Sequence, residues 1–248
     1  MGLVNKVELP RKVCPVIFLL DTSGSMDGQP IGALNYAMES ILPELESMNK
    51  SNPDAEIRVA ALTFQTDEKG SAVVTWVTGD SGLQATEGYK WTGVEARYGT
   101  PMGAAFVELE RVLHVESGFM NSASGSVAPV LFLLSDGQPT DDYQSGLEKL
   151  QENNWYNVAA RVAIGYGQSN DSILEEFTKN PDTVKHTNNV EDLKELIQFV
   201  TITSSMVASS GRKSTSEGDE EDSDDTTNAV AAALKNAPPK LAPTDENW

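Results

Sequence analysis

The feature that most constrains the fold is an unbroken apolar run that stops abruptly at a polar segment. Residues 13–20 read VCPVIFLL and are followed directly by DTSGS. The runs VAPVLFLL at 127–134 and VAARVAIGYG at 158–167 end in the same way, in a polar or glycine-containing loop. Strands that are apolar on both faces belong to parallel sheets that are covered by helices. These three runs therefore predict buried parallel strands.

Amphipathic segments separate and follow these runs, with apolar side chains at three- and four-residue spacing. The predicted helices span residues 31–48, 102–115, 143–152, 172–179 and 190–206. The apolar stretches 56–64 and 71–78 are separated by only six residues, which suits an antiparallel hairpin. The alternation predicts an α/β fold with a doubly wound, mostly parallel sheet, one antiparallel edge strand and helices on both faces.

Composition divides the chain into three parts. Residues 1–12 form a short N-terminal extension, residues 13–207 have the apolar density of one domain, and residues 208–248 are acidic with few large apolar side chains. Such a composition buries too little apolar surface to fold, so we expect 208–248 to be a disordered acidic tail. Its alanine-rich piece 228–235 suits a solvated linker, or a transient helix that forms on a partner.

Charge and cysteine content limit the partners and the compartment. The formal net charge of −19 disfavours a nucleic-acid partner, because polyanions repel each other. Cys14 is the single cysteine, so no intrachain disulfide forms and a reducing compartment is allowed. The sequence shows no signal-peptide pattern and no apolar run of roughly 18 residues. We therefore expect a cytoplasmic protein without membrane contact.

Oxygen-bearing side chains follow the predicted strands where each strand ends. In open α/β sheets, ligands bind beyond the carboxyl ends of the strands, where the strand order reverses. The first strand leads into Asp21, Ser23 and Ser25, the run at 127–134 leads to Asp136, and Thr100 lies in a loop just before a predicted helix. We expect these five side chains to converge.

The chemistry of these side chains indicates a hard divalent cation. Mg²⁺ prefers oxygen ligands, and no His/Cys cluster favours zinc. Mg²⁺ is therefore the expected ion, with Mn²⁺ or Ca²⁺ as alternatives. Because three of the five oxygens are neutral hydroxyls, the ion stays incompletely satisfied. An Asp or Glu from a protein partner would complete its coordination shell.

Each of these residues also has an ordinary structural interpretation. The DTSGS segment fits a strand-end turn that caps the next helix, Thr100 before Pro101 fits a helix N-cap, and Asp136-Gly137 fits an ordinary turn. Asp141 and Asp142 fit first-turn helix acids that follow a Thr140 cap. Spacing and strand context together favour ligation only for the five residues named above.

The pattern DTSGS at 21–25, followed by GTP at 99–101 and SDG at 135–137, resembles the metal-ion-dependent adhesion site of von Willebrand factor A domains. The resemblance covers roughly residues 13–207. It implies hydroxyl ligation by Ser23, Ser25 and Thr100, and ligation directly or through water by Asp21 and Asp136. It further implies a non-catalytic protein-interaction module in which a partner carboxylate takes the open position of the ion.

More narrowly, LLDTSGSMDGQPI, YGTPMGAAF and LLSDGQPTDD look like the bacterial TerY-like branch of this family. Members of that branch are cytoplasmic and are associated with tellurium-resistance and stress gene clusters. Membership would imply a kinase-like protein, a phosphatase or other Ter proteins as partners. The acidic tail is not part of that pattern.

Two other functions remain as alternatives. An aspartate that ends a buried strand can accept a phosphoryl group with the help of Mg²⁺, which would make Asp21 a nucleophile. Phosphatases of the haloacid dehalogenase type, however, need a second carboxylate two residues later, where this chain has Ser23. A purely structural ion is the third possibility, and its removal would unfold the protein.

Four aromatic residues lie in or near the long polar loop 79–99, and they have two interpretations. They could form a partner-binding rim, because Trp and Tyr are favoured interface anchors, or they could pack as a satellite core under the loop. These residues are Trp76, Tyr89, Trp91 and Tyr98.

Overall fold

The computed structural model describes most of the chain between residues 11 and 236. The described ranges are 11–52, 55–79, 82–117, 119–120, 125–167, 169–187, 189–209 and 226–236. Seven strands form one sheet in the order β3-β2-β1-β5-β6-β7, with β4 beside β2. Their bounds are β1 (Lys12–Asp21), β2 (Ala55–Thr66), β3 (Ala72–Trp76), β4 (Gln84–Ala85), β5 (Val130–Ser135), β6 (Ala160–Gly165) and β7 (Val184–His186).

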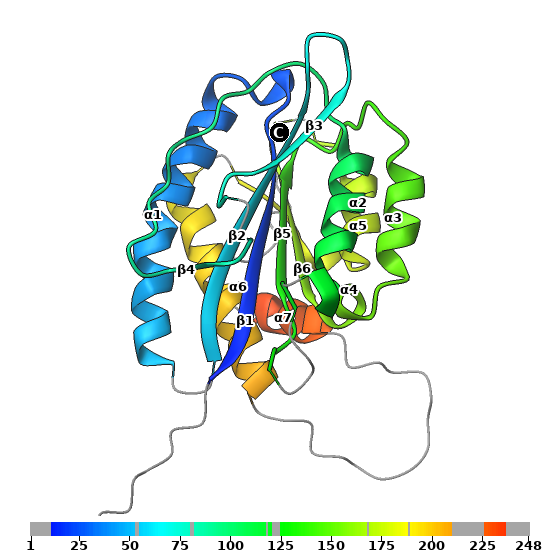
Figure 1. Cartoon of the computed structure of the whole chain (residues 1–248). Helices are drawn as coiled ribbons and strands as arrows, with labels where there is room; N and C mark the ends of the chain where they lie inside the picture. The colour runs from blue at the N-terminus through cyan, green and yellow to red at the C-terminus, as the bar shows by residue number, and fades with distance from the viewer. Residues whose placement is uncertain are drawn as a thin grey trace, which may run out of the picture.

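Five of the strands run parallel, and the antiparallel pairs lie on the β2 side of the sheet. β2 pairs in parallel with β1 and antiparallel with β3 and β4, whereas β5, β6 and β7 continue the parallel pairing on the other side of β1. The prediction of a mostly parallel sheet with an antiparallel edge strand is confirmed (Figure 1).

Helices cover both faces of this sheet, as expected (Figure 1). One face carries α1 (Gln29–Ser51) and α6 (Val190–Ser209), and the other carries α2 (Met102–Val112), α3 (Tyr143–Gln151) and α5 (Asp171–Thr178). The remaining helices are α4 (Asn154–Val158), α7 (Thr226–Lys235) and the 3₁₀ turns η1 (Gly24–Met26), η2 (Val115–Ser117) and η3 (Pro181–Thr183).

The central strand β1 shows why its sequence lacks polar alternation. Val16, Phe18 and Leu20 pack on the side of α1 and α6, whereas Ile17 and Leu19 pack on the side of α2, α3 and α5. All five side chains are fully buried, and each such burial contributes roughly 1.5–3 kcal/mol. The two-sided core fixes β1 in the sheet, and its polar continuation therefore emerges at the carboxyl edge.

The prediction of a disordered tail is wrong for residues 226–235. The last predicted helix continues as α6 to Ser209, and residues 226–235 form α7. The rest of the predicted tail, 210–225 and 237–248, lies outside the described residues, as do residues 1–10 of the predicted N-terminal extension. The predicted domain boundaries stay a prediction.

α7 folds because it carries a narrow apolar stripe that the acidic average of the tail conceals. Val230 and Leu234, one helical turn apart, are fully buried in the core that includes α6 and β6. The Thr227 hydroxyl accepts a hydrogen bond from the Arg161 amide (3.0 Å) and donates one to the Ala159 carbonyl (2.9 Å) at the start of β6. The segment is therefore neither a solvated linker nor free for a partner in this structure.

Candidate metal site

The strands that lead to the predicted carboxylate ligands end at the carboxyl edge of the sheet. This edge is the upper end of the view in Figure 1, where β1 passes into α1. β1 ends at Asp21, and Asp136 directly follows β5, the strand beside β1. The chain leaves β1 toward β2 and leaves β5 toward β6, on opposite sides. The two carboxylates therefore flank the point where the strand order reverses, which is the usual ligand crevice of such sheets.

Asp21 is a fully buried carboxylate that is held at both oxygens. Its Oδ1 accepts from the Ser23 amide (2.9 Å), and its Oδ2 accepts from the Ser135 hydroxyl (2.5 Å). Burial is the largest influence on its pKa and raises it to about 6; these hydrogen bonds lower the pKa, and the nearby charge of Asp136 raises it. Neutral donors therefore do not compensate the buried charge, whereas a cation at this position would.

Two serine hydroxyls lie beside this carboxylate in the tight turn η1. The Oγ atoms of Ser23 and Ser25 are 3.0 Å apart, and Ser23 is buried whereas Ser25 is exposed. The Met26 amide donates to the Ser23 carbonyl (3.0 Å), which closes the turn. The turn thus presents two adjacent hydroxyl oxygens to the same region.

The loop that carries Thr100 is bound to two neighbouring segments. The Thr100 amide donates to the Thr140 hydroxyl (2.9 Å), and the Thr140 amide donates back to the Thr100 carbonyl (2.8 Å). One residue earlier, Gly99 exchanges hydrogen bonds with Thr66 at the end of β2. Thr100 itself is buried, so the loop holds this residue away from bulk solvent.

Asp136 lies in a turn that requires glycine at the next position. Its Oδ1 accepts from the Gln138 amide (3.2 Å), and its carbonyl accepts from the Asn170 amide (2.9 Å). Gly137 has a φ of 65°, and a Cβ there would lie 2.9 Å from the Asn170 carbonyl oxygen. The Asp136 carboxylate is therefore positioned by a backbone donor of its own loop, and its backbone is held by a donor of the β6–α5 loop.

The capping interpretations are only partly right. Pro101, not Thr100, is the N-cap of α2, and Asp141 accepts hydrogen bonds from two amides in the first turn of that helix. Asp142, not Thr140, caps α3 by accepting from the Ser145 amide. Asp141 and Asp142 thus serve helix termini, whereas Thr140 holds the Thr100 loop.

Sequence reasoning missed two supporting residues, Ser135 and Thr140. Ser135 donates to Asp21 and also accepts from the Gly137 amide (2.9 Å), so it connects the two carboxylate loops. A buried serine between an apolar run and an aspartate was the only local signal for this role. The pairing of Thr140 with Thr100 joins residues 40 positions apart, which no local pattern reveals.

The residues present fit a hard divalent cation. Among the described residues, no group of three or more His, Cys, Asp or Glu side chains could hold a metal. Any ion at this edge would depend on hydroxyl oxygens together with the two carboxylates, a donor set that suits Mg²⁺, Mn²⁺ or Ca²⁺ better than zinc.

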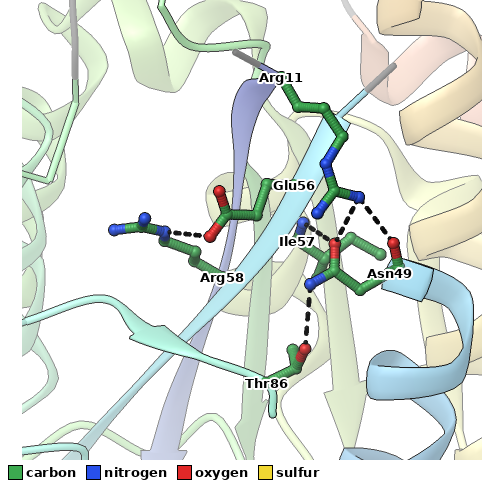
Figure 2. A network of polar contacts seen from close by, with 6 residues as sticks. All are labelled: Arg11, Asn49, Glu56, Ile57, Arg58 and Thr86. Atoms are coloured by element: carbon green, nitrogen blue, oxygen red, sulfur yellow. Dashed lines mark hydrogen bonds and ion pairs between the residues drawn. The ribbon is translucent and has the colours of Figure 1, made fainter. Parts of the chain in front are cut away.

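The long loop between β3 and α2 crosses α1 (Figure 1), and two asparagines of that helix hold it there. The Asn35 Oδ1 accepts from the Trp91 indole (2.9 Å) and from the Val94 amide (2.8 Å). Figure 2 shows the second attachment: Asn49 donates to the Thr86 hydroxyl (3.2 Å) and accepts from the Ile57 amide of β2 (2.9 Å). The loop is thus fixed along α1 before it reaches the carboxyl edge.

The structure separates the four aromatic residues near this loop. Tyr89 and Trp91 pack against the core on the α1 side, and Trp76 packs edge-on against Phe119. The core-packing interpretation is therefore correct for these three. Tyr98 differs, because it is 51% exposed.

The chain belongs to the von Willebrand factor type A domain family, whose model matches residues 16–201. Domains of this family commonly act as metal-dependent protein-interaction modules. No curated protein shows significant sequence similarity to the chain. Among the described residues, no helix has both the length and the apolarity to cross a membrane.

Solved structures with the same fold include bacterial and animal proteins. The pilus adhesin SpaC from Lactobacillus rhamnosus GG is 11% identical with a TM-score of 0.60, over 81% of this chain and 31% of SpaC. A von Willebrand factor type A protein from Catenulispora acidiphila is 18% identical with a TM-score of 0.55, over 79% and 43%. Proximal thread matrix protein 1 from the mussel byssus, with a zinc occupied MIDAS motif, is 19% identical with a TM-score of 0.50, over 77% and 48%. The chain spans less than half of each of these proteins, and at these identities the likeness shows the fold alone.

Proposed function

We propose that this domain binds a divalent cation and uses it to accept a carboxylate from a protein partner. The observation that carries the proposal is the buried Asp21 carboxylate, which lies near Asp136 at the carboxyl edge and has only neutral hydrogen-bond donors. A dication there would be neutralised by two carboxylates at most, and hydroxyl ligands add no charge. The ion would therefore keep an affinity for one further anionic oxygen.

The arrangement of donors supports a division of roles among the five residues. Both oxygens of Asp21 already accept protein hydrogen bonds, which favours contact with the ion through water. The adjacent hydroxyls of Ser23 and Ser25, together with Thr100, would bind the ion directly, and Asp136 would bind it directly or through water. Mg²⁺ is the proposed ion, with Mn²⁺ or Ca²⁺ as alternatives.

The same geometry disfavours a phosphoryl-transfer enzyme, and we propose no catalytic residue. A nucleophilic carboxylate needs an accessible oxygen, yet Asp21 is fully buried and hydrogen-bonded at both oxygens. Ser23 stands where phosphatases with an aspartate nucleophile need their acid, and a serine hydroxyl is too weakly acidic for that role.

A purely structural ion is also less well supported. The loops that carry the proposed ligands are joined to one another by protein hydrogen bonds, including the Ser135–Asp21 bond and the Thr100–Thr140 exchange. These bonds hold the edge together without an ion. Metal removal should therefore abolish partner binding and leave the fold intact.

The cellular setting is a proposal that rests on sequence alone. The segments LLDTSGSMDGQPI, YGTPMGAAF and LLSDGQPTDD support a TerY-like role in a cytoplasmic tellurium-resistance or stress-response complex. The proposed partners are then a kinase-like protein, a phosphatase or other Ter proteins.

The test combines metal titration with partner capture. Isothermal titration with Mg²⁺ and Mn²⁺ should detect one site in the wild type and none in Ser23→Ala/Ser25→Ala. The matched control is Ser47→Ala/Ser51→Ala, which removes two exposed hydroxyls at the far end of α1. Partners captured in Mg²⁺ should be lost in EDTA and in the first variant, with circular dichroism unchanged. Unchanged capture in EDTA would refute the mechanism, and loss of the circular dichroism signal in EDTA would favour a structural ion.

A further inference from the structure

Tyr98 has a backbone conformation that its side chain disfavours. Its φ is 55°, and Lys179 is the other described non-glycine residue with positive φ. A bulky residue in this left-handed region costs about 1–2 kcal/mol relative to an ordinary conformation, whereas glycine adopts it freely. A tyrosine at this position therefore needs a reason beyond the path of the backbone.

The backbone around Tyr98 explains the conformation without the ring. The Tyr98 carbonyl accepts from the Gly24 amide (2.7 Å), and the Arg97 amide donates to the Thr22 carbonyl (2.7 Å). Both contacts join the loop to the β1–α1 turn, where Thr22 and Gly24 alternate in sequence with the proposed ligands of that turn. Glycine could make the same two bonds, because neither involves a side chain.

The ring is not a core element either. The other aromatic residues of this region pack against the two cores of the sheet, but Tyr98 is 51% exposed. It lies two residues before Thr100, beside the turn that holds Ser23 and Ser25. An exposed aromatic ring in a strained backbone, next to the face where a partner carboxylate would approach, is the signature of a contact residue and not of a stabilising one.

Charges near the ring define the chemistry of the partner. The exposed base beside it, Arg97, forms an ion pair with Glu95 (2.5 Å) and also interacts electrostatically with Glu68. Asp27 is exposed in the turn next to Ser25, and the whole chain carries a formal charge of −19. A second acidic side chain on the partner would be repelled here, whereas Lys or Arg would be attracted and could stack on the tyrosine ring.

We infer that Tyr98 receives the side chain that flanks the partner's metal-binding acid, and that this flanking residue is Lys or Arg. The partner is thus a protein segment with an isolated Asp or Glu next to a basic residue. This inference rests on the proposed metal-dependent function, and it specifies which residues of a partner that site would bind.

The test uses a phage-displayed library of random 12-residue peptides, selected on the immobilised full chain in Mg²⁺ and eluted with EDTA. Wild-type protein should enrich peptides with an Asp or Glu beside a Lys or Arg. Tyr98→Gly should bind the enriched peptides roughly 5- to 30-fold more weakly, which corresponds to about 1–2 kcal/mol for a cation over an aromatic ring. Tyr98→Phe, which keeps the ring, should bind within about twofold of the wild type.

Two readouts separate a contact role from a structural one. In EDTA, Tyr98→Gly should melt at the wild-type temperature or above it, because glycine relieves the strain at φ 55°. Its Mg²⁺ affinity should equal that of the wild type. Tyr36→Ala is the matched control, because it removes a tyrosine that is 53% exposed two turns along α1, and it should change neither binding nor selection.

The possible failures are distinguishable. A lower melting temperature for Tyr98→Gly would show that the ring is structural and would overturn the inference. The inference would also be overturned by EDTA-eluted peptides whose acid has no basic residue beside it, or by peptides that bind Tyr98→Gly as well as the wild type. Either result would leave the proposed function standing. If the wild type yields no EDTA-eluted peptides with a common acid, the proposed function fails, and the inference fails with it.

Discussion

Replacing Asp21 by asparagine should stabilise the metal-free protein at neutral pH, although it removes a central residue of the candidate site. The folded-state pKa of Asp21 is about 6, against an ordinary value of 3.8. Between these values the unfolded chain has released its proton and the folded protein has not, so stability falls as pH rises. Above pH 6 the loss is complete, and the difference between the folded and unfolded pKa values corresponds to about 3 kcal/mol.

Asparagine avoids this cost because it does not ionise. Its Oδ1 can still accept from the Ser23 amide, and its Nδ2 can donate to the Ser135 hydroxyl, which reorients. The raised pKa already includes the effect of these hydrogen bonds on the charged form, so only the reversal of the Ser135 bond is subtracted, at about 1 kcal/mol. The expected net gain for Asp21→Asn at pH 7.5 in EDTA is therefore about 2 kcal/mol.

Urea unfolding of both proteins in EDTA, followed by circular dichroism, measures this difference. Comparing variant with wild type at each pH cancels the other titrating groups, and pH 5 keeps the protein above its pI of about 4.4. The advantage of the variant should grow by about 1 kcal/mol between pH 5 and pH 7.5, as the Asp21 charge develops. At a Mg²⁺ concentration of 100 Kd the wild type should gain about 2.7 kcal/mol and the variant nothing. An advantage that does not change with pH, or a variant less stable than the wild type at pH 7.5, would refute the reasoning.

Three further substitutions test the surrounding structure. Gly146→Ala should destabilise the protein by about 1–3 kcal/mol, because the added Cβ would lie 2.4 Å from the Gly103 carbonyl oxygen and push α3 away from α2. The Thr140 loop leads into α3 and the Thr100 loop leads into α2, so the substitution should also weaken Mg²⁺ binding in calorimetry. Leu234→Ala should cost about 2–3 kcal/mol in urea unfolding, since this side chain of α7 is fully buried; no change would mean that α7 does not pack on the domain in solution. Lys185→Met should raise stability at pH 7. The Lys185 side chain is only 6% exposed, its amine has no hydrogen-bond partner among the described residues, and burial lowers its pKa. A lowered pKa means that stability is lost as pH falls, so the gain from methionine should shrink near pH 10, and a gain that persists unchanged there would contradict the explanation.

The fold could be predicted from sequence where a single segment carries the whole signal. The run at 13–20 is apolar throughout because β1 is covered on both faces, and these eight residues alone predict a buried strand. The positions of Asp21 and Asp136 follow from the same runs, since parallel neighbours end at one edge. Their role as metal ligands stays a prediction.

Short or averaged signals could not be interpreted in this way. β4 and β7 contain two and three residues, too few for any periodicity. Residues 226–235 were hidden because the surrounding acids dominate the composition, whereas the helix depends on a few apolar side chains such as Val230 and Leu234. Ser135 was overlooked because its partner, Asp21, lies 114 residues away, and only the pairing of β1 with β5 brings them together.

Two locally unfavourable residues, Asp21 and Tyr98, lie at the carboxyl edge of the sheet. The Asp21 carboxylate is buried at a cost in stability, and Tyr98 has a conformation suited to glycine, whereas Gly137 is the favourable residue for a turn that no larger side chain fits. The three lie on loops that are hydrogen-bonded to one another or to a shared neighbour. Folding alone would favour asparagine at 21 and glycine at 98. Because neither residue is the more stable choice at its position, the buried charge and the exposed ring are best explained by what this edge binds, and both belong to the proposed recognition surface.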